Sequence, residues 1–170
     1  MAVREIKTLP SSVLRRKARK VAAFGPELQT LIDDMVETMR EAPGVGLAAP
    51  QVDVSLRVIV VEFGDEEDEE APKKLYTMLN PVITRPSEEK VVATEACLSI
   101  PGFVGDVERH QAITIKGLNR FGKPMRVNAH GWLARIFQHE IDHLDGVLYI
   151  DRAQEVWRPE EAEAEVVAAD

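Results

Sequence analysis

The chain has 170 residues, of which 45% are hydrophobic, and this length is enough for one well-buried core without requiring a second domain. Its formal net charge of −8 argues against broad nucleic-acid binding, because contacts with phosphates need a basic surface. No apolar run approaches the roughly 18 residues that would span a bilayer, and residues 1–10 lack the apolar stretch of a secretory signal. We therefore expect a globular protein of the cytoplasm that binds neither membranes nor nucleic acids.

The first half of the chain contains a predicted helix and a predicted strand, joined by a loop that carries glycines. Between residues 26 and 40, apolar residues recur at helical spacing, which predicts an amphipathic helix. Residues 44–51, GVGLAAPQ, follow as a loop, and LRVIVVEF at 56–63 is typical of a buried strand. The like charges of the acidic run at 64–74 repel one another, so we expect a solvated hairpin loop there.

The second half is richer in predicted strands and ends in a second helix. Strand-like segments, separated by proline and glycine, are expected near 75–84, 90–96, 112–118 and 124–129. An apolar stripe over residues 131–144 predicts a helix that buries one face. Short strands beside two substantial helices predict an α+β fold, with antiparallel or mixed strands packed around the second helix.

We expect a single domain over residues 1–152. The tail at 153–170 is acidic, rich in alanine and interrupted by a proline. This composition predicts a tail that is partly helical or mobile.

The HEIDH run and the only cysteine of the chain together suggest a metal site. On a helix, a spacing of four places His139 and His143 on one face, where two ring nitrogens can converge on one ion. Because Cys97 has no disulfide partner within the chain, its thiol serves packing, metal binding or nucleophilic chemistry. Three protein ligands would leave a fourth position for water, as catalytic sites do.

A metal in such a site would favour hydrolysis of an amide. It would lower the pKa of a bound water to about 7 and polarise a carbonyl. Glu140 lies beside the two histidines in the sequence, so it can take the proton of that water and later deliver it to a leaving amine. The softness of a thiolate and two imidazoles indicates zinc or iron(II).

Other polar groups could complete the site. The oxyanion that forms on the attacked carbonyl needs further donors, and the side-chain amide of Gln51 and the backbone N–H of Leu98 are candidates. An ordinary surface position is the alternative for Gln51. Glu95 could pair with Arg109 or orient His139, or it could be a surface charge of a strand.

Three separated blocks resemble one enzyme family in their combination, order and spacing: GVGLAAPQ at 44–51, EACLS at 95–99 and QHEIDHLDG at 138–146. The chain is similar to the peptide deformylases over residues 1 to about 152. The resemblance implies a metal-dependent hydrolase that removes the formyl group from the initiator methionine of nascent chains and releases formate. It also implies the cytoplasm of a bacterium or, in an organelle, the matrix or stroma.

The resemblance further implies roles for single residues. Glu140 would be the general base and then the general acid as metal-bound water attacks the formyl carbon, while Gln51 and the Leu98 amide stabilise the oxyanion. The implied metal ligands are Cys97, His139 and His143. The family works with Fe(2+) and has more durable Ni(2+) and Zn(2+) forms. The residues implied to line the methionine pocket or to bind the substrate backbone are Gly44, Val45, Gly46, Trp132, Arg135 and Ile136, with the region 100–102 alongside.

The chain departs from the family pattern at two places. The second block usually reads EGCLS, and Ala96 replaces its glycine. If the backbone had to take a positive φ there, alanine would strain it by about 1 kcal/mol or more, but we expect an ordinary conformation. Some relatives associate with the ribosome through a basic helix at the carboxyl end, and the acidic tail argues against such docking here.

Two other functions fit part of the pattern. A zinc endopeptidase shares HEIDHLDG, but Tyr149 occupies the place of the third histidine of one protease pattern, and Glu155 is a poorly placed substitute. A non-catalytic binding module could retain a structural metal, yet it would need neither Glu140 nor Gln51.

Overall fold

The computed structural model describes residues 2–65 and 67–159, and its strands form two antiparallel sheets. The larger sheet contains, in spatial order, β1 (Gly46–Ala48), β2 (Val58–Phe63), β3 (Lys74–Ile83), β6 (Ala112–Leu118) and β7 (Pro124–His130). The smaller sheet contains β4 (Lys90–Cys97), β5 (Ile100–His110) and β8 (Val156–Trp157). The helical elements are η1 (Ser12–Arg15), α1 (Pro26–Glu41), η2 (Ala49–Val52), α2 (Gly131–Leu144) and α3 (Tyr149–Arg152). The predicted α+β fold is confirmed.

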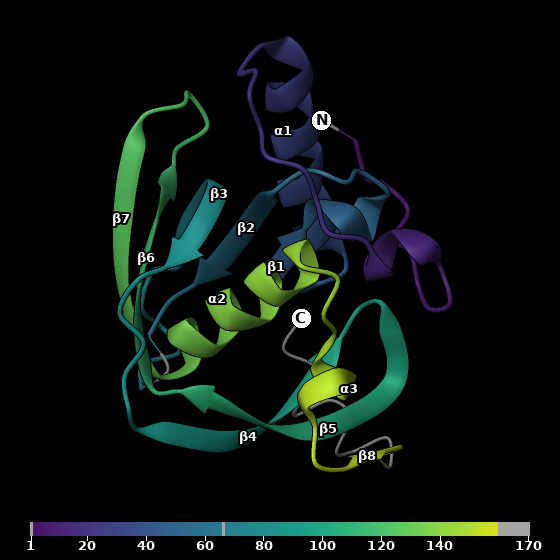
Figure 1. Cartoon of the computed structure of the whole chain (residues 1–170), viewed down its shortest axis with the longest axis vertical. Helices are drawn as coiled ribbons and strands as arrows, with labels where there is room; N and C mark the ends of the chain where they lie inside the picture. The colour runs from purple at the N-terminus through teal and green to yellow at the C-terminus, as the bar shows by residue number, and fades with distance from the viewer. Residues whose placement is uncertain (1, 66, 160–170) are drawn as a thin grey trace.

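The first four residues of β2, Val58 to Val61, are buried on both faces of the sheet, which explains this unbroken apolar run. Val58 and Val60 pack in a core cluster with residues of α1, whereas Ile59 and Val61 pack in a second cluster with residues of α2. Successive side chains of a strand point to opposite faces, so the two helices cover opposite faces of the larger sheet. Figure 1 shows α2 lying across the front of this sheet.

Helix α2 lies between the two sheets. Its apolar stripe packs on the larger sheet, where Phe137 is fully buried and meets the ring of Tyr76 edge-on at 5.4 Å between centroids. Its polar side faces the smaller sheet, because Gln138 accepts a hydrogen bond from the His110 amide of β5. The helix therefore carries polar side chains into the interior of the fold.

The longest strand of the described chain, β5 with 11 residues, was missed by the sequence analysis. Its sequence, IPGFVGDVERH, combines proline, two glycines and several charges, all of which weaken strand propensity. Continuous pairing with β4, from Lys90 opposite His110 to Glu95 opposite Gly105, stabilises it instead. The strand depends on a neighbour that the local pattern does not reveal.

Of the two predicted loops, one contains more structure than expected and the other is as predicted. The segment 44–51 contains β1, which pairs with β2, and η2. The acidic segment 64–74 joins β2 to β3 as a hairpin loop, as predicted. At the carboxyl end, Val156 and Trp157 form β8 against β5, so this part of the predicted tail is a strand and not a helix. Residues 160–170 lie outside the described residues.

None of the helices in the described part of the chain combines the length and the apolar character needed to cross a membrane.

Candidate metal centre

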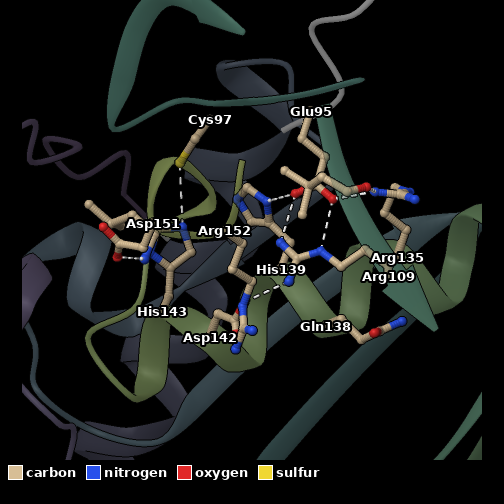
Figure 2. A network of polar contacts seen from close by, with 12 residues as sticks. Glu95, Cys97, Arg109, Arg135, Gln138, His139, Asp142, His143, Asp151 and Arg152 are labelled. Atoms are coloured by element: carbon tan, nitrogen blue, oxygen red, sulfur yellow. Dashed lines mark hydrogen bonds and ion pairs between the residues drawn. The ribbon is translucent and has the colours of Figure 1, made fainter. Parts of the chain in front are cut away.

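The cysteine and the two histidines of the sequence motifs converge inside the fold. Cys97 ends β4, while His139 and His143 lie one turn apart on α2. One ligand atom from each lies within 4.8 Å of the others, and all three residues are buried. Figure 2 shows the thiol of Cys97 facing the His143 ring, with 3.4 Å between Sγ and Nε2. A sulfur and two imidazole nitrogens at this spacing form a donor set that suits a soft or borderline divalent metal.

Glu95 orients the first histidine. Its Oε1 lies 2.9 Å from Nδ1 of His139, and because an ionised carboxylate only accepts hydrogen bonds, Nδ1 carries the proton. The Nε2 lone pair is then the one directed to a metal. Glu95 is only 2% exposed, so the alternative that it is a surface charge is wrong, and both its pairing with Arg109 and its contact with His139 are confirmed.

Two guanidinium groups surround the Glu95 carboxylate (Figure 2). Arg109 binds both oxygens, at 2.9 and 2.8 Å, and Arg135 donates to Oε2 at 2.6 Å. Arg109 also reaches Asp142 of α2 at 2.6 Å, and Arg152 closes the network on Asp142 at 2.7 Å. Buried charges are tolerated only when they are paired in this way.

The network keeps the titratable groups in the states that a metal requires. Burial alone would raise the pKa of Glu95, but the hydrogen bonds from Arg109 and His139 and the charge of Arg109 outweigh burial and hold the pKa well below its usual value. Burial drives the pKa of His143 well below its usual 6.5, and the positive charge of Arg109 acts in the same direction. Glu95 is therefore an anion and His143 a neutral imidazole, the form that binds metals.

Glu140 lies against the glycine loop. Its side chain is 1% exposed, and a Cβ added to Gly46 would lie 2.6 Å from its Oε2 and 3.0 Å from its Cδ. Real Cβ atoms essentially never approach so closely. The absence of a side chain at Gly46 therefore makes room for the carboxylate beside the histidines.

The Gln51 side chain is held at the same centre. Its Oε1 accepts a hydrogen bond from the Ala48 amide at 3.0 Å, while its Nε2 lies 3.1 Å from Ser99 Oγ and 3.7 Å from Cys97 Sγ. Gln51 is 2% exposed, so the surface alternative is wrong. Leu98 and Ser99 form the turn between β4 and β5. Ser99 was missed by the sequence analysis, although it belongs to the EACLS block.

Ala96 fits the fold without backbone strain. Among the described residues, the positive φ values of non-glycine residues occur at Asp53 and Asn80, so Ala96 has an ordinary conformation, as expected. On β4 it is the single residue between Glu95 and Cys97, whereas Pro101 to Val104 fill the same interval on β5. The extra residues at this register shift are therefore on β5.

Tyr149 stands where one protease pattern has its third metal-binding histidine, and here its side chain packs against His139. Its ring stacks on His139 at 6.1 Å between centroids, and its hydroxyl donates to the Phe103 carbonyl at 3.0 Å. The residue at the place of the third protease histidine is therefore used for packing beside the site.

Three of the six residues predicted for the substrate pocket, Val45, Trp132 and Arg135, line two hollows that share Trp132. Val45 lines a hollow of about 640 Å³ with the acidic hairpin loop, and Arg135 lines one of about 130 Å³. The Arg135 guanidinium carbon lies 5.7 Å from the Trp132 ring centre. Ile136 is 2% exposed and packs in the core, and Gly46 begins β1 just after Gly44 and Val45. Their roles in substrate binding stay predictions.

Comparison with known proteins agrees with this geometry. The family model described as polypeptide deformylase matches residues 3–158. The chain is 51% identical to the peptide deformylase of Symbiobacterium thermophilum, with coverage of 98% of this chain and 76% of the relative. Its structure is similar to that of peptide deformylase from Thermotoga maritima, with a TM-score of 0.84, 38% identity and coverage of 91% and 100% of the two chains.

A second solved structure is informative because of its bound peptide. The Met-Ala-Ser-bound class I type b peptide deformylase from Acinetobacter baumannii has a TM-score of 0.82 at 37% identity, with coverage of 89% of this chain and 98% of that one. Neither the endopeptidase nor the binding-module alternative accounts for these similarities. The chain belongs to the polypeptide deformylase family, whose members are metal-dependent enzymes that remove N-formyl groups from polypeptides.

Proposed function

We propose that this chain removes the formyl group from the initiator formylmethionine of nascent polypeptides by means of Cys97, His139, His143, Glu140 and Gln51. The observation that carries the proposal is the convergence of the three donor residues at one buried point within 4.8 Å. In the reaction, water adds to the formyl carbon and the carbon–nitrogen bond breaks. The products are formate and a free amino terminus.

Cys97, His139 and His143 would hold the metal. Their sulfur and nitrogen donors fit zinc, nickel or iron(II), and we propose Fe(2+) as the working metal with Ni(2+) or Zn(2+) as durable substitutes. When bound, the metal supplies a Lewis acid that polarises the formyl carbonyl and makes water acidic enough to react near neutral pH. The Glu95 carboxylate fixes the His139 ring from behind, which holds one of the two imidazoles in the required orientation.

Glu140 and Gln51 would handle protons and charge. The Glu140 carboxylate takes a proton from the attacking water and later delivers it to the departing amine nitrogen. The Gln51 amide donates toward the region of Cys97 and, with the Leu98 backbone N–H, would stabilise the oxyanion. Because Gln51 is anchored on Ala48 and Ser99, its donors need little reorganisation during the reaction.

The substrate would bind as an added strand. β1 is the edge strand of the larger sheet, and an extended peptide can pair with such an edge. The Acinetobacter relative binds Met-Ala-Ser, and we propose the same class of ligand here, along 44–46 and 100–102. Val45, Trp132, Arg135 and Ile136 would surround the methionine side chain.

We propose the bacterial cytoplasm as the location, because the relatives named above come from bacteria and formylated chains emerge there from ribosomes. The substrate is then the nascent chain itself. We do not propose docking on the ribosome through the carboxyl-terminal tail, because this tail is acidic.

Formate release from formyl-Met-Ala-Ser, with protein prepared anaerobically, tests this function. We expect stoichiometric formate and free Met-Ala-Ser, with activity after reconstitution by Fe(2+) and slower loss of activity in air after reconstitution by Ni(2+). Absence of formate together with cleavage of an internal peptide bond would contradict the proposal and favour an endopeptidase.

A further inference from the structure

Arg135 ties the helix of the histidines to the hairpin of the cysteine. Its Nη1 donates to Glu95 Oε2 at 2.6 Å and to the Val107 carbonyl at 2.8 Å, and its Nη2 donates to the Val91 carbonyl at 2.6 Å. Val91 lies on β4 and Val107 on β5. One guanidinium thus contacts both strands of the hairpin and the carboxylate that orients His139.

These contacts matter because the three proposed ligands come from two separate units. His139 and His143 move with α2, whereas Cys97 moves with β4. The apolar residues of α2 fix the helix against the larger sheet, but they do not set its distance from the cysteine hairpin. Polar contacts of Arg135, Gln138 and Asp142 with the smaller sheet bridge that distance, beside the packing of Tyr149 in the cluster of Cys97.

Arg135 is well placed among these contacts. It precedes His139 by four residues, so the two side chains lie on the same side of the helix, one turn apart. Asp142 holds the hairpin from the other side of His139 by its ion pair with Arg109 at 2.6 Å. Arg135 is 5% exposed, so water cannot readily replace its three hydrogen bonds. A rigid fork of donors suits this purpose better than a single ammonium.

We infer that Arg135 is a positioning residue that sets the separation between the Cys97 thiolate and the two imidazoles, and thereby the metal affinity of the site. The inference rests on the proposed ligand set. It assigns to Arg135 a role beyond lining the substrate pocket. Outer residues of this kind change metal affinity by roughly 10- to 100-fold when they are removed.

The test compares Arg135→Met, Arg135→Lys and the control Arg120→Met. Arg120 also binds a carboxylate and a backbone carbonyl, on Asp33 and Gln29, but it joins the β6–β7 turn to α1. The control therefore removes a similar guanidinium at a place remote from the ligands. Circular dichroism and thermal unfolding establish which variants fold.

Two measurements report on the metal site independently of turnover. The first is the dissociation constant of Zn(2+), obtained by competition with a chelator. The second is the absorption of the Co(2+)-substituted protein, whose sulfur-to-cobalt charge-transfer band reports the thiolate bond. We expect Arg135→Met to weaken zinc binding by roughly 10- to 100-fold and to weaken or shift the cobalt band. Arg135→Lys should fall between Arg135→Met and the wild type, and Arg120→Met should match the wild type.

Wild-type zinc affinity and an unchanged cobalt band in folded Arg135→Met would overturn the inference. If Arg135→Met does not fold, wild-type values in Arg135→Lys would overturn it equally, because the single nitrogen of an ammonium cannot occupy the positions of both Nη1 and Nη2. Cys97→Ala is measured in parallel. Zinc bound by Cys97→Ala as tightly as by the wild type would show that the proposed ligand set is wrong, which is a different failure from an unaffected Arg135 variant.

Discussion

A methyl group at Gly46 should displace Glu140, the proposed general base. The added Cβ would lie 2.6 Å from Glu140 Oε2, and 3.4 Å is the lower bound of an ordinary contact, so the carboxylate or β1 must move by about 0.8 Å. Gly46 pairs with Val61 in the register of β1 and β2, which restrains the backbone. We therefore expect the Glu140 side chain to absorb most of the movement in Gly46→Ala.

The effect on catalysis should be larger than the effect on folding. A misplacement of about 1 Å costs on the order of 100-fold in rate, which corresponds to about 2.7 kcal/mol in the barrier. Overpacking of a buried site typically costs about 1–3 kcal/mol of stability. We expect Gly46→Ala to lower kcat by about 100-fold while the protein stays folded and keeps its metal.

Formate release under anaerobic conditions measures kcat, and metal analysis of the same samples measures occupancy. Gly25→Ala is the control, because a Cβ added to Gly25 meets nothing within 4 Å. A double-mutant cycle with Glu140→Ala separates displacement of the base from a block of substrate binding. Gly46→Ala should have little further effect on kcat in the Glu140→Ala background. Wild-type kcat in Gly46→Ala, or full additivity in the double mutant, would refute this reasoning.

Three other changes test the site and the core. Glu140→Ala should keep the metal and lose at least about 100-fold in kcat, because general acid–base catalysis contributes roughly 10²- to 10⁴-fold; substantial activity in the metal-loaded variant would contradict its role. Phe137→Ala should lower the free energy of unfolding by about 3–5 kcal/mol, as measured by denaturant titration, since the ring is fully buried; a loss under 1 kcal/mol would contradict the packing. The third concerns Asp34, where burial favours a higher pKa but the Ala2 amide and the Arg4 guanidinium outweigh it and hold the pKa below 3.8. Its contribution to stability is therefore present above about pH 4 and is lost as the pH falls through the lower folded-state pKa. The stability difference between wild type and Asp34→Asn should shrink on acidification below pH 4, and a difference that grows would contradict this assignment.

Much of the architecture follows from local sequence pattern. The helix predicted at 131–144 is found with these bounds. A helix that buries one face shows an apolar stripe at helical spacing, and this pattern is visible in the sequence without knowledge of the neighbouring segments. The strand predicted at 112–118 is also found with its predicted bounds. The spacing of His139 and His143, together with the single cysteine, indicated a metal site from the sequence, while packing and nucleophilic chemistry were the alternatives for the thiol of Cys97.

Only the tertiary structure decided the features that depend on which segments become neighbours. β5 became a strand because β4 and β8 pair with it, although its own sequence is unfavourable. In the sequence, Glu95 could pair with Arg109, orient His139 or be a surface charge. Packing of α2 against the hairpin brought Arg109, Arg135 and His139 to it together. The sequence by itself determined which chemical groups the site contains, because that depends on residue type and local spacing. Their distances, burial and charge states were determined by long-range packing, because each depends on residues tens of positions away.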